Sequence, residues 1–288
     1  MKLLLLISSL LFTSQLIAKP LVVTTIRPMT MLVEAIAGDS VEIKQLLPDS
    51  EVPHHYSLRI SDQALLAQAD LLLWVGPEME SFLSKSVTAL HPEKVITAIT
   101  LPDIQGLSSA KHTANSDPHI WMNPENGRVI ATEVSNWLAA HYPERREQLL
   151  AAQQLFNQRL TQVSADTSAQ LKTLQQVNFI VDHDAFGHFA EAFNLQQSGA
   201  LKNNTGLSGG ARQRHQLFSQ DDIRCIIAEP RHNHNRVAQL TKKLNAEIAV
   251  IDPLGADIPL SSPAYAQLIE TIGQKIATCL SPPSTPAR

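Results

Sequence analysis

The sequence predicts an α/β protein with two lobes of parallel-sheet βα units joined by one long backbone helix. Three observations support this prediction: short apolar runs alternate with amphipathic stretches in the first half, a long glycine-free stretch follows, and the alternation then resumes. Such alternation is typical of parallel βα units. A chain of 288 residues with 44% hydrophobic content is long enough for two domains.

The first half contains three apolar runs that predict buried strands and three patterns that predict helices. The strands are expected over residues 21–25, 41–47 and 71–75. The helices are expected over residues 29–37, 61–69 and 126–141. Gly38 ends the first helix, and Ser61 is expected to cap the second.

The middle of the chain predicts a connecting helix over residues 143–177. This stretch has no glycine and no proline after Pro143, which suits the first position of a helix. At 1.5 Å per residue the run would be about 50 Å long, enough to cross a domain. Two alternatives remain open: one long helix, or two helices broken near residues 164–168.

The second half repeats the βα pattern. Strands are expected over residues 179–182, 225–228 and 248–251, and helices over 186–193, 235–244 and 262–280. The domain boundaries that follow are a signal peptide over 1–18, a first lobe over 19–142, the helix over 143–177, a second lobe over 178–280 and a disordered tail over 281–288.

The first 18 residues have the features of a secretory signal peptide. A basic start at Lys2 precedes an apolar stretch, and a small residue, Ala18, marks the expected cleavage position. The apolar stretch is too short for a retained membrane span. We therefore expect an exported protein that begins near Lys19.

The charge and the cysteines argue against nucleic-acid binding, a redox pair and a cysteine metal site. The net charge is −4 and no Lys/Arg cluster stands out, so the signature of nucleic-acid binding is absent. The two cysteines, Cys225 and Cys279, are far apart and form no C-x-x-C motif. In an exported protein this favours one structural disulfide over a redox pair or a cysteine metal site.

One histidine lies in an unusually constrained loop. His119 stands between Pro118 and Pro124, and proline restricts both its own backbone and that of the preceding residue. A pre-positioned imidazole loses little entropy on binding, which suits a metal ligand. The ordinary alternative for a single histidine is a packed or surface side chain.

Three more candidate ligands follow predicted strands. His54 comes after the strand at 41–47 and a turn, His183 directly follows 179–182, and Asp252 directly follows 248–251. Parallel sheets bind ligands beyond the carboxyl ends of their strands. Together with His119, these residues offer three imidazoles and one carboxylate, which suits Zn²⁺ best and Mn²⁺ second. Two alternatives remain: Asp252 as the cap of a turn, and His183 as a buried histidine bonded to the backbone.

These segments resemble the periplasmic metal-binding receptors of bacterial ABC importers, and among them the zinc-uptake (ZnuA-like) type. The matching motifs are Leu46-Leu47-Pro48-Asp49, Pro53-His54-His55-Tyr56, Val75-Gly76-Pro77-Glu78-Met79-Glu80, Asp117-Pro118-His119-Ile120-Trp121, His183-Asp184-Ala185-Phe186-Gly187, Ala228-Glu229-Pro230 and Asp252-Pro253-Leu254-Gly255.

The resemblance implies two α/β lobes bridged by a long helix, with the metal in the cleft between them. His54, His119 and His183 fall on the family's three histidine ligands, and Asp252 falls where many members, especially manganese-binding ones, supply a carboxylate. Cys225 and Cys279 match the cysteines that zinc-type members pair in a disulfide.

The chain also departs from the family's pattern. Residues 111–116, which include His112, replace the long His/Asp/Glu-rich loop of many zinc-type members, so a secondary metal-collecting site is expected to be weak or missing. Pro53 stands where some members have an acidic residue. His55 adjoins His54, but successive side chains usually point apart, so direct ligation by His55 is not expected. For His232 and His234 two alternatives remain open: a solvated turn, which is the more common case, and an added low-affinity metal loop.

The function that follows is a periplasmic solute-binding protein that captures Zn²⁺ and delivers it to an ABC permease in the inner membrane, acting as a monomer. Glu78, Glu80 and Glu93 are candidate contacts with the permease. One alternative is a manganese receptor of the same family. Another is an exported zinc hydrolase, for which Glu229 is the only obvious base; we expect no catalytic residues.

Overall fold

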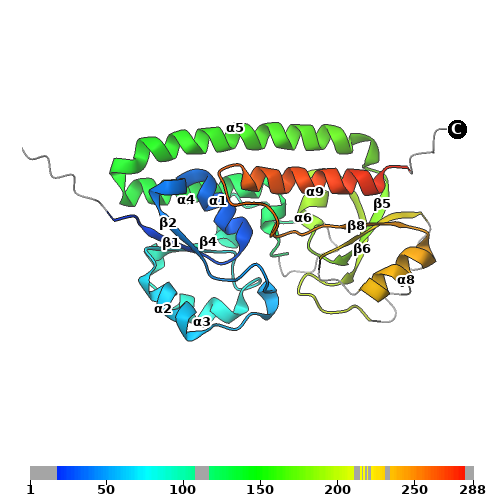
Figure 1. Cartoon of the computed structure of the whole chain (residues 1–288), viewed down its shortest axis with the longest axis horizontal. Helices are drawn as coiled ribbons and strands as arrows, with labels where there is room; N and C mark the ends of the chain where they lie inside the picture. The colour runs from blue at the N-terminus through cyan, green and yellow to red at the C-terminus, as the bar shows by residue number, and fades with distance from the viewer. Residues whose placement is uncertain are drawn as a thin grey trace, which may run out of the picture.

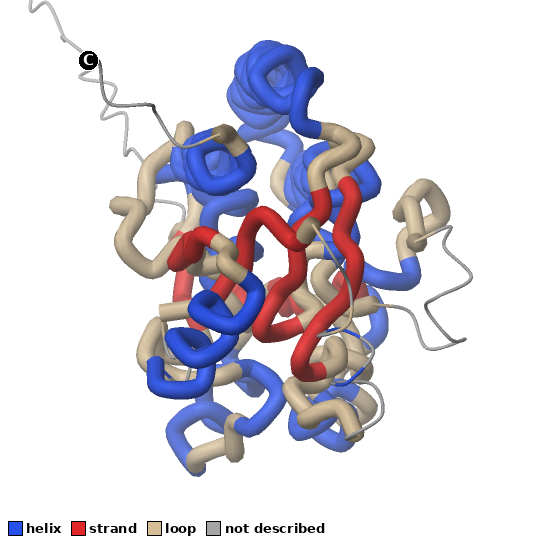
Figure 2. The backbone as a smooth tube through the Cα atoms, turned by 90° about the vertical axis from the view of Figure 1, so that its right-hand side faces the viewer, coloured by secondary structure: helices blue, strands red, loops and turns tan. Residues whose placement is uncertain are grey.

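Two four-stranded parallel sheets form two lobes side by side, and one long helix crosses above both (Figure 1). The structure is a computed structural model that describes residues 18–107, 117–210, 215, 217, 219, 222–230 and 234–282. The predicted α/β architecture with a connecting helix is confirmed. Seen from the right-hand side of Figure 1, the strands lie in the middle, with the long helix above them and other helices at their sides (Figure 2).

The first lobe contains the sheet β2-β1-β3-β4. Its strands are β1 (Leu21–Thr24), β2 (Glu42–Gln45), β3 (Leu71–Trp74) and β4 (Val95–Thr97). Its helices are α1 (Arg27–Ala37), α2 (Ile60–Gln68), α3 (Ser84–Val87) and α4 (Pro124–His141). The sequence did not predict β4, because a strand of three residues at the sheet edge is too short to show a periodic pattern.

Two helix starts in this lobe are set by side chains that accept backbone hydrogen bonds. The Asp62 carboxylate accepts the Arg59 amide at 2.8 Å, and α2 begins at Ile60. The expected Ser61 cap is therefore wrong, since Ser61 already lies inside the helix. At α4, Asn123 caps the helix by accepting the Glu125 amide at 2.9 Å.

The connecting helix α5 (Arg146–Leu171) is unbroken over 26 residues, with short 3-10 turns before and after it. At 1.5 Å per residue it is about 39 Å long, and it packs on helices of both lobes. Thr167, near the predicted break, is buried against Gly273 of α9, which lacks the Cβ that would clash there. This close contact explains why the helix continues through the serine-rich stretch.

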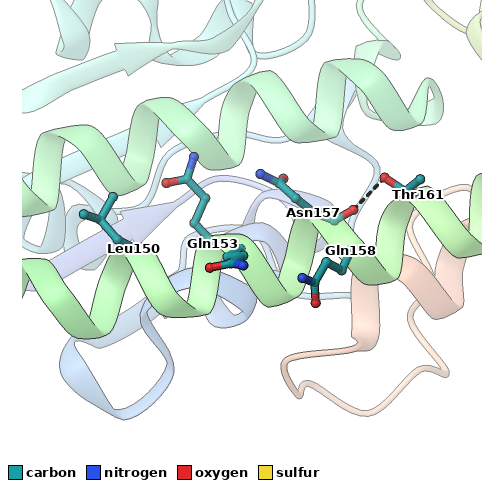
Figure 3. A pocket seen from close by; sticks show the side chains of 6 residues that line it. Leu150, Gln153, Asn157, Gln158 and Thr161 are labelled. Carbon is teal, nitrogen blue, oxygen red and sulfur yellow. Dashed lines mark hydrogen bonds between the residues drawn. The ribbon is translucent and has the colours of Figure 1, made fainter.

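A pocket lies along one side of α5, and the side chains that line it all come from this helix (Figure 3). The six lining residues are Leu150, Gln153, Gln154, Asn157, Gln158 and Thr161. Thr161 donates to the Asn157 carbonyl at 2.8 Å. The lining contains no imidazole, thiol or carboxylate, so this pocket lacks the usual metal ligands.

The second lobe contains the sheet β6-β5-β7-β8. Its strands are β5 (Asn178–His183), β6 (Gln196–Lys202), β7 (Ile223–Ala228) and β8 (Glu247–Val250). Its helices are α6 (Gly187–Ala192), α8 (His234–Leu244) and α9 (Ala264–Leu280). The polar sequence of β6 explains why it was not predicted: as an edge strand it needs no continuous apolar run.

A disulfide between Cys225 and Cys279 joins β7 to α9 inside the second lobe. The two Cα atoms lie 5.7 Å apart, and both cysteines are buried. The predicted structural disulfide is confirmed.

Several predicted segments lie outside the described residues. These are most of the signal peptide (1–17), the short loop with His112 (111–116), the stretch with His232 (231–233) and most of the tail (283–288). Among the helices that the structure does describe, none has the length and apolar character needed to cross a membrane.

The two sheets share a topological feature that positions functional residues. In each sheet the second strand lies on one side of the first strand, and the third strand lies on the other side. The switch point is therefore between β1 and β3 in the first sheet and between β5 and β7 in the second. Loops at the carboxyl ends of such strands diverge and leave a crevice. His183 ends β5 and Glu229 follows β7, which places both at the switch point of the second lobe.

Candidate metal centre

Three histidines from different parts of the chain converge between the lobes. His54, His119 and His183 each offer a ring nitrogen, and these atoms all lie within 4.8 Å of one another. The ring centroids are 5.0 to 5.9 Å apart. His119 is buried and the other two are partly buried. Within the described residues, this is the only such group that could hold a metal ion.

His54 is positioned by a short 3-10 turn over Pro53–His55 that follows the first lobe's β2. The next residue, Tyr56, is buried and donates its hydroxyl to the Asp62 carboxylate at 2.7 Å. The pKa of Tyr56 is raised to about 12, mainly by burial and secondly by this hydrogen bond. The hydroxyl therefore stays a donor at any physiological pH, and it ties the His54 turn to the start of α2.

His119 is oriented by a carboxylate two residues earlier in the chain. Asp117 Oδ1 accepts both the His119 backbone amide at 3.0 Å and His119 Nδ1 at 2.7 Å. Burial opposes the charge on Asp117, but the His119 imidazole and its hydrogen bonds outweigh burial and lower the pKa of the carboxyl to about 2. Because Nδ1–H donates a hydrogen bond to the carboxylate, the lone pair of a neutral His119 ring lies on Nε2.

His183 is oriented by Glu229, which reaches it across the switch point. His183 Nδ1 lies 2.7 Å from Glu229 Oε1, and Nε2 lies 3.2 Å from the Asn204 carbonyl. Burial lowers the pKa of His183, but the hydrogen bond and charge of Glu229 outweigh it, and the net direction is upward. Burial raises the pKa of Glu229, but the hydrogen bond and charge of His183 outweigh it, and the net direction is downward.

Both partners of His183 are acceptors, so the ring in this conformation donates from both nitrogens. A metal would have to replace the proton on Nε2, and the ring would have to leave the Asn204 carbonyl. Since Nδ1–H donates a hydrogen bond to Glu229, Nε2 is the nitrogen suited to a metal. The alternative of a backbone-bonded His183 is thus partly right, because Nε2 bonds to the Asn204 carbonyl.

Asp252 has a different environment from the three histidines. Its Oδ1 accepts the Leu254 amide at 2.9 Å and its Oδ2 accepts the Ala256 amide at 2.7 Å. It shares a pocket wall with Pro53 and Glu229, yet it does not belong to the group of atoms within 4.8 Å. The structure thus places Asp252 beside the site as the cap of its own turn, and ligation by Asp252 stays a prediction.

The neighbouring histidines have other roles or fall outside the description. His188 of α6 is buried, and its Nε2 bonds to the Asp117 carbonyl at 3.0 Å, which links the second lobe to the His119 loop. The side chains of His55 and His234 are not among those described, and His112 and His232 lie in undescribed segments.

Glu80, proposed from the sequence as a permease contact, is fully buried, so that prediction is wrong. Burial raises the pKa of its carboxyl to about 7. It accepts the Thr25 hydroxyl at 2.5 Å and the Gly76 amide at 3.0 Å at the carboxyl ends of β1 and β3.

Sequence reasoning missed the roles of the two carboxylates that orient the imidazoles. Asp117 lies two residues before His119, and that spacing lets one side chain reach both the amide and the ring. Glu229 directly follows the buried strand β7 and His183 ends β5, and neighbouring parallel strands end at the same edge. The local spacing and the strand ends were the signals that could have revealed them.

The chain is similar to known zinc-uptake proteins. The model of the ZnuA family, described as zinc-uptake complex component A, periplasmic, matches residues 22–279. A high-affinity zinc uptake system protein ZnuA from Yersinia pestis is 31% identical over 92% of each chain. The protein of the same name from Haemophilus ducreyi is 29% identical over 90% of this chain and 93% of its own.

Solved structures share the fold. The periplasmic zinc-binding protein TroA from Treponema pallidum has a TM-score of 0.80 at 23% identity, covering 92% of this chain and all of its own. A zinc-bound ZnuA deletion mutant also has a TM-score of 0.80, at 25% identity, covering 92% of this chain and 99% of its own.

Proposed function

Because the chain belongs to the ZnuA family of periplasmic zinc-uptake components, we propose that it captures Zn²⁺ between its lobes and delivers it to an ABC permease. The observation that carries this proposal is the convergence of three imidazoles, from both lobes, within 4.8 Å. A site made by both lobes couples the bound cargo to their relative position, which a receptor needs in order to signal that it is loaded.

The proposed ligands are His54, His119 and His183. Zn²⁺ binds imidazole nitrogen at about 2.0–2.1 Å with four-coordinate geometry. Nitrogen atoms within 4.8 Å of one another need only a small approach to surround one ion. The fourth position would go to water or to Asp252, and the backbone bonds of Asp252 favour water.

The donor set also supports Zn²⁺ over Mn²⁺, the alternative cargo. Affinity for a nitrogen-rich site is higher for Zn²⁺ than for Mn²⁺, whereas Mn²⁺ prefers oxygen ligands. A manganese receptor would need Asp252 or another carboxylate to join the three imidazoles.

A hydrolase remains the alternative from another class, and the surroundings of Glu229 argue against it. A general base must lie within reach of a metal-bound water. The Glu229 carboxylate instead bonds to a ring nitrogen of His183 at 2.7 Å, which orients a ligand. We therefore assign no catalytic residue.

Export, a monomeric state and docking on a permease belong to the proposed function. The chain would be exported and cleaved near Ala18, and would act as a monomer that docks on an inner-membrane permease. The functional divisions would be a first lobe over 19–142, the connecting segment over 143–177, a second lobe over 178–280 and a tail over 281–288.

The direct test is a competition titration of Zn²⁺ against Mn²⁺ on the metal-free protein. We expect one tightly bound Zn²⁺ per chain, and a large loss of affinity in His54→Ala, His119→Ala and His183→Ala. The control is His91→Ala, because His91 is an exposed histidine outside the site. Tighter Mn²⁺ binding, unchanged Zn²⁺ affinity in His119→Ala, or turnover in a panel of hydrolase substrates would contradict the proposal.

A further inference from the structure

The loop between β8 and α9 belongs to the second lobe, but the first lobe holds it through Arg27. Arg27 Nε donates to the Gly255 carbonyl at 3.0 Å, and Nη2 donates to the Ile258 carbonyl. Its Nη1 forms an ion pair with Asp49 at 2.6 Å. The Arg27 side chain is only 12% exposed, and its two bonds to the loop carbonyls are partly buried, whereas the Asp49 side chain is 38% exposed. All three guanidinium nitrogens are therefore committed to one geometry.

A second side chain of the first lobe holds the same loop. Trp121, two residues after His119, donates from Nε1 to the Pro253 carbonyl at 2.9 Å. Its ring is buried and lies 5.3 Å from the His119 ring, centroid to centroid. The loop that carries Asp252 is thus fixed to the loop that carries a proposed metal ligand.

The peptide held by Trp121 also binds Asp252. The Pro253 carbonyl and the Leu254 amide belong to one peptide group: the carbonyl accepts from Trp121, and the amide donates to Asp252 Oδ1 at 2.9 Å. A hydrogen bond at the carbonyl polarises the peptide and strengthens its N–H as a donor.

The peptide held by Arg27 has the same arrangement. The Gly255 carbonyl accepts from Arg27, and the Ala256 amide of that peptide donates to Asp252 Oδ2 at 2.7 Å. Gly255 has a φ of +68°, and an added Cβ would lie 3.1 Å from Met31 of α1, so the turn also packs tightly on the first lobe. Each oxygen of Asp252 is therefore held by a peptide that the first lobe anchors.

We propose that Arg27 and Trp121 are positioning residues for metal selectivity: by anchoring these two peptides they keep the Asp252 carboxylate away from the three imidazoles. The cargo is then bound by nitrogen ligands, and Mn²⁺, which needs the oxygen ligand, is disfavoured. Asp252 lies beside the site, because it lines a pocket with Pro53, the neighbour of His54, and with Glu229, the partner of His183. This inference rests on the proposed role of the three histidines.

The test measures Zn²⁺ and Mn²⁺ affinity, by competition, in Arg27→Gln and in Trp121→Phe, which removes the N–H but keeps an aromatic ring. Each is made alone and combined with Asp252→Asn. The matched control is Arg159→Gln, which removes one positive charge from the exposed face of α5. The visible absorption of bound Co²⁺ gives a second readout, because its intensity falls as coordination rises above four.

We expect Mn²⁺ affinity relative to Zn²⁺ to rise by about tenfold in the single anchor variants, the size typical of residues that orient metal ligands. The Co²⁺ bands should weaken, and Asp252→Asn should reverse both changes, while Arg159→Gln leaves them as in the wild type. Circular dichroism shows whether each variant folds. Trp121→Phe decides the question if Arg27→Gln does not fold.

An unchanged metal ratio and Co²⁺ spectrum in a folded anchor variant would overturn the inference. So would a change that persists in the double variant with Asp252→Asn. A wild-type protein that binds no Zn²⁺ would instead overturn the proposed function, so the two failures are distinguishable.

Discussion

At the scale of single residues, two carboxylates orient two of the proposed ligands. Asp117 bonds to Nδ1 of His119, and Glu229 bonds to Nδ1 of His183, each at 2.7 Å. A carboxylate on one ring nitrogen fixes the ring orientation and makes the other nitrogen a better metal ligand. The proposed site therefore depends on residues other than its ligands.

We expect Asp117→Asn and Glu229→Gln each to weaken Zn²⁺ binding by about 10- to 100-fold, the usual cost of removing such partners. Isothermal titration against a competing chelator measures the loss. Glu93→Gln is the control, since Glu93 is an exposed carboxylate that lies 3.8 Å from the exposed His91, outside the site. Equal affinities in wild type and both variants would show that the carboxylates do not position the rings.

The pH dependence of binding follows from the His183 environment. Each imidazole must be neutral to bind, and the ordinary histidine pKa is about 6.5. Burial lowers the pKa of His183, but Glu229 raises it by more. Protons therefore compete with Zn²⁺ for this ring already at pH values above the ordinary histidine pKa. Zn²⁺ affinity should therefore begin to fall above pH 6.5 as pH decreases.

In Glu229→Gln the fall should begin at a lower pH, because the charge that retains the proton is gone. Zn²⁺ titrations across the range from about pH 5 to 8 test both statements. An affinity that is constant across this range would rule out imidazole ligands.

At the scale of elements, the disulfide cross-links a strand and a helix of the second lobe. The bond joins the central strand β7 to the last helix α9 across 54 residues of sequence. Closing a loop of this length restricts the unfolded chain, and the chain-entropy model assigns about 4 kcal/mol to that restriction.

We expect a Cys225→Ala/Cys279→Ala double variant to lose up to about 4 kcal/mol of unfolding free energy, less where the unfolded chain is already compact. Urea denaturation monitored by circular dichroism measures the loss. Thiol titration of the unfolded, non-reduced wild type should find no free thiol, and two free thiols would contradict the disulfide.

At the scale of the whole molecule, side chains from α9 and α6 bond to the loop that carries His119. The Tyr265 hydroxyl at the start of α9 donates to the Trp121 carbonyl at 2.7 Å, and His188 of α6 bonds to the Asp117 carbonyl. Tyr265 reaches this position because Gly127 of α4 has no side chain: an added Cβ would lie 2.2 Å from the Tyr265 hydroxyl oxygen. A single glycine thus permits the lobes to pack closely beside the site.

Gly127→Ala should therefore destabilise the protein by about 1–3 kcal/mol, the range for overpacking a buried contact, even though alanine favours helix. Thermal unfolding followed by circular dichroism measures the change. Gly106→Ala is the matched control, because a Cβ there would meet nothing within 4 Å. A Gly127→Ala protein as stable as the wild type would mean that Tyr265 moves aside without cost.

The sequence alone determined the fold class and most of the elements. Apolar runs such as residues 71–75 identify buried parallel strands, and the glycine-free stretch after Pro143 identifies the connecting helix, because hydrophobic periodicity is local information. Proline-bracketed His119 and strand-terminal His183 were also recognisable, since both signals lie within a few residues. The short edge strand β4 and the polar edge strand β6 gave no such signal.

Only the tertiary structure decided how the site is held together. That α5 continues through residues 164–168 depends on Thr167 packing against Gly273, a contact between residues far apart in sequence. The same holds for the bonds of Asp252, which follow from a turn whose carbonyls are anchored by Arg27 and Trp121. Such contacts have no local pattern, because each joins residues that are far apart in sequence.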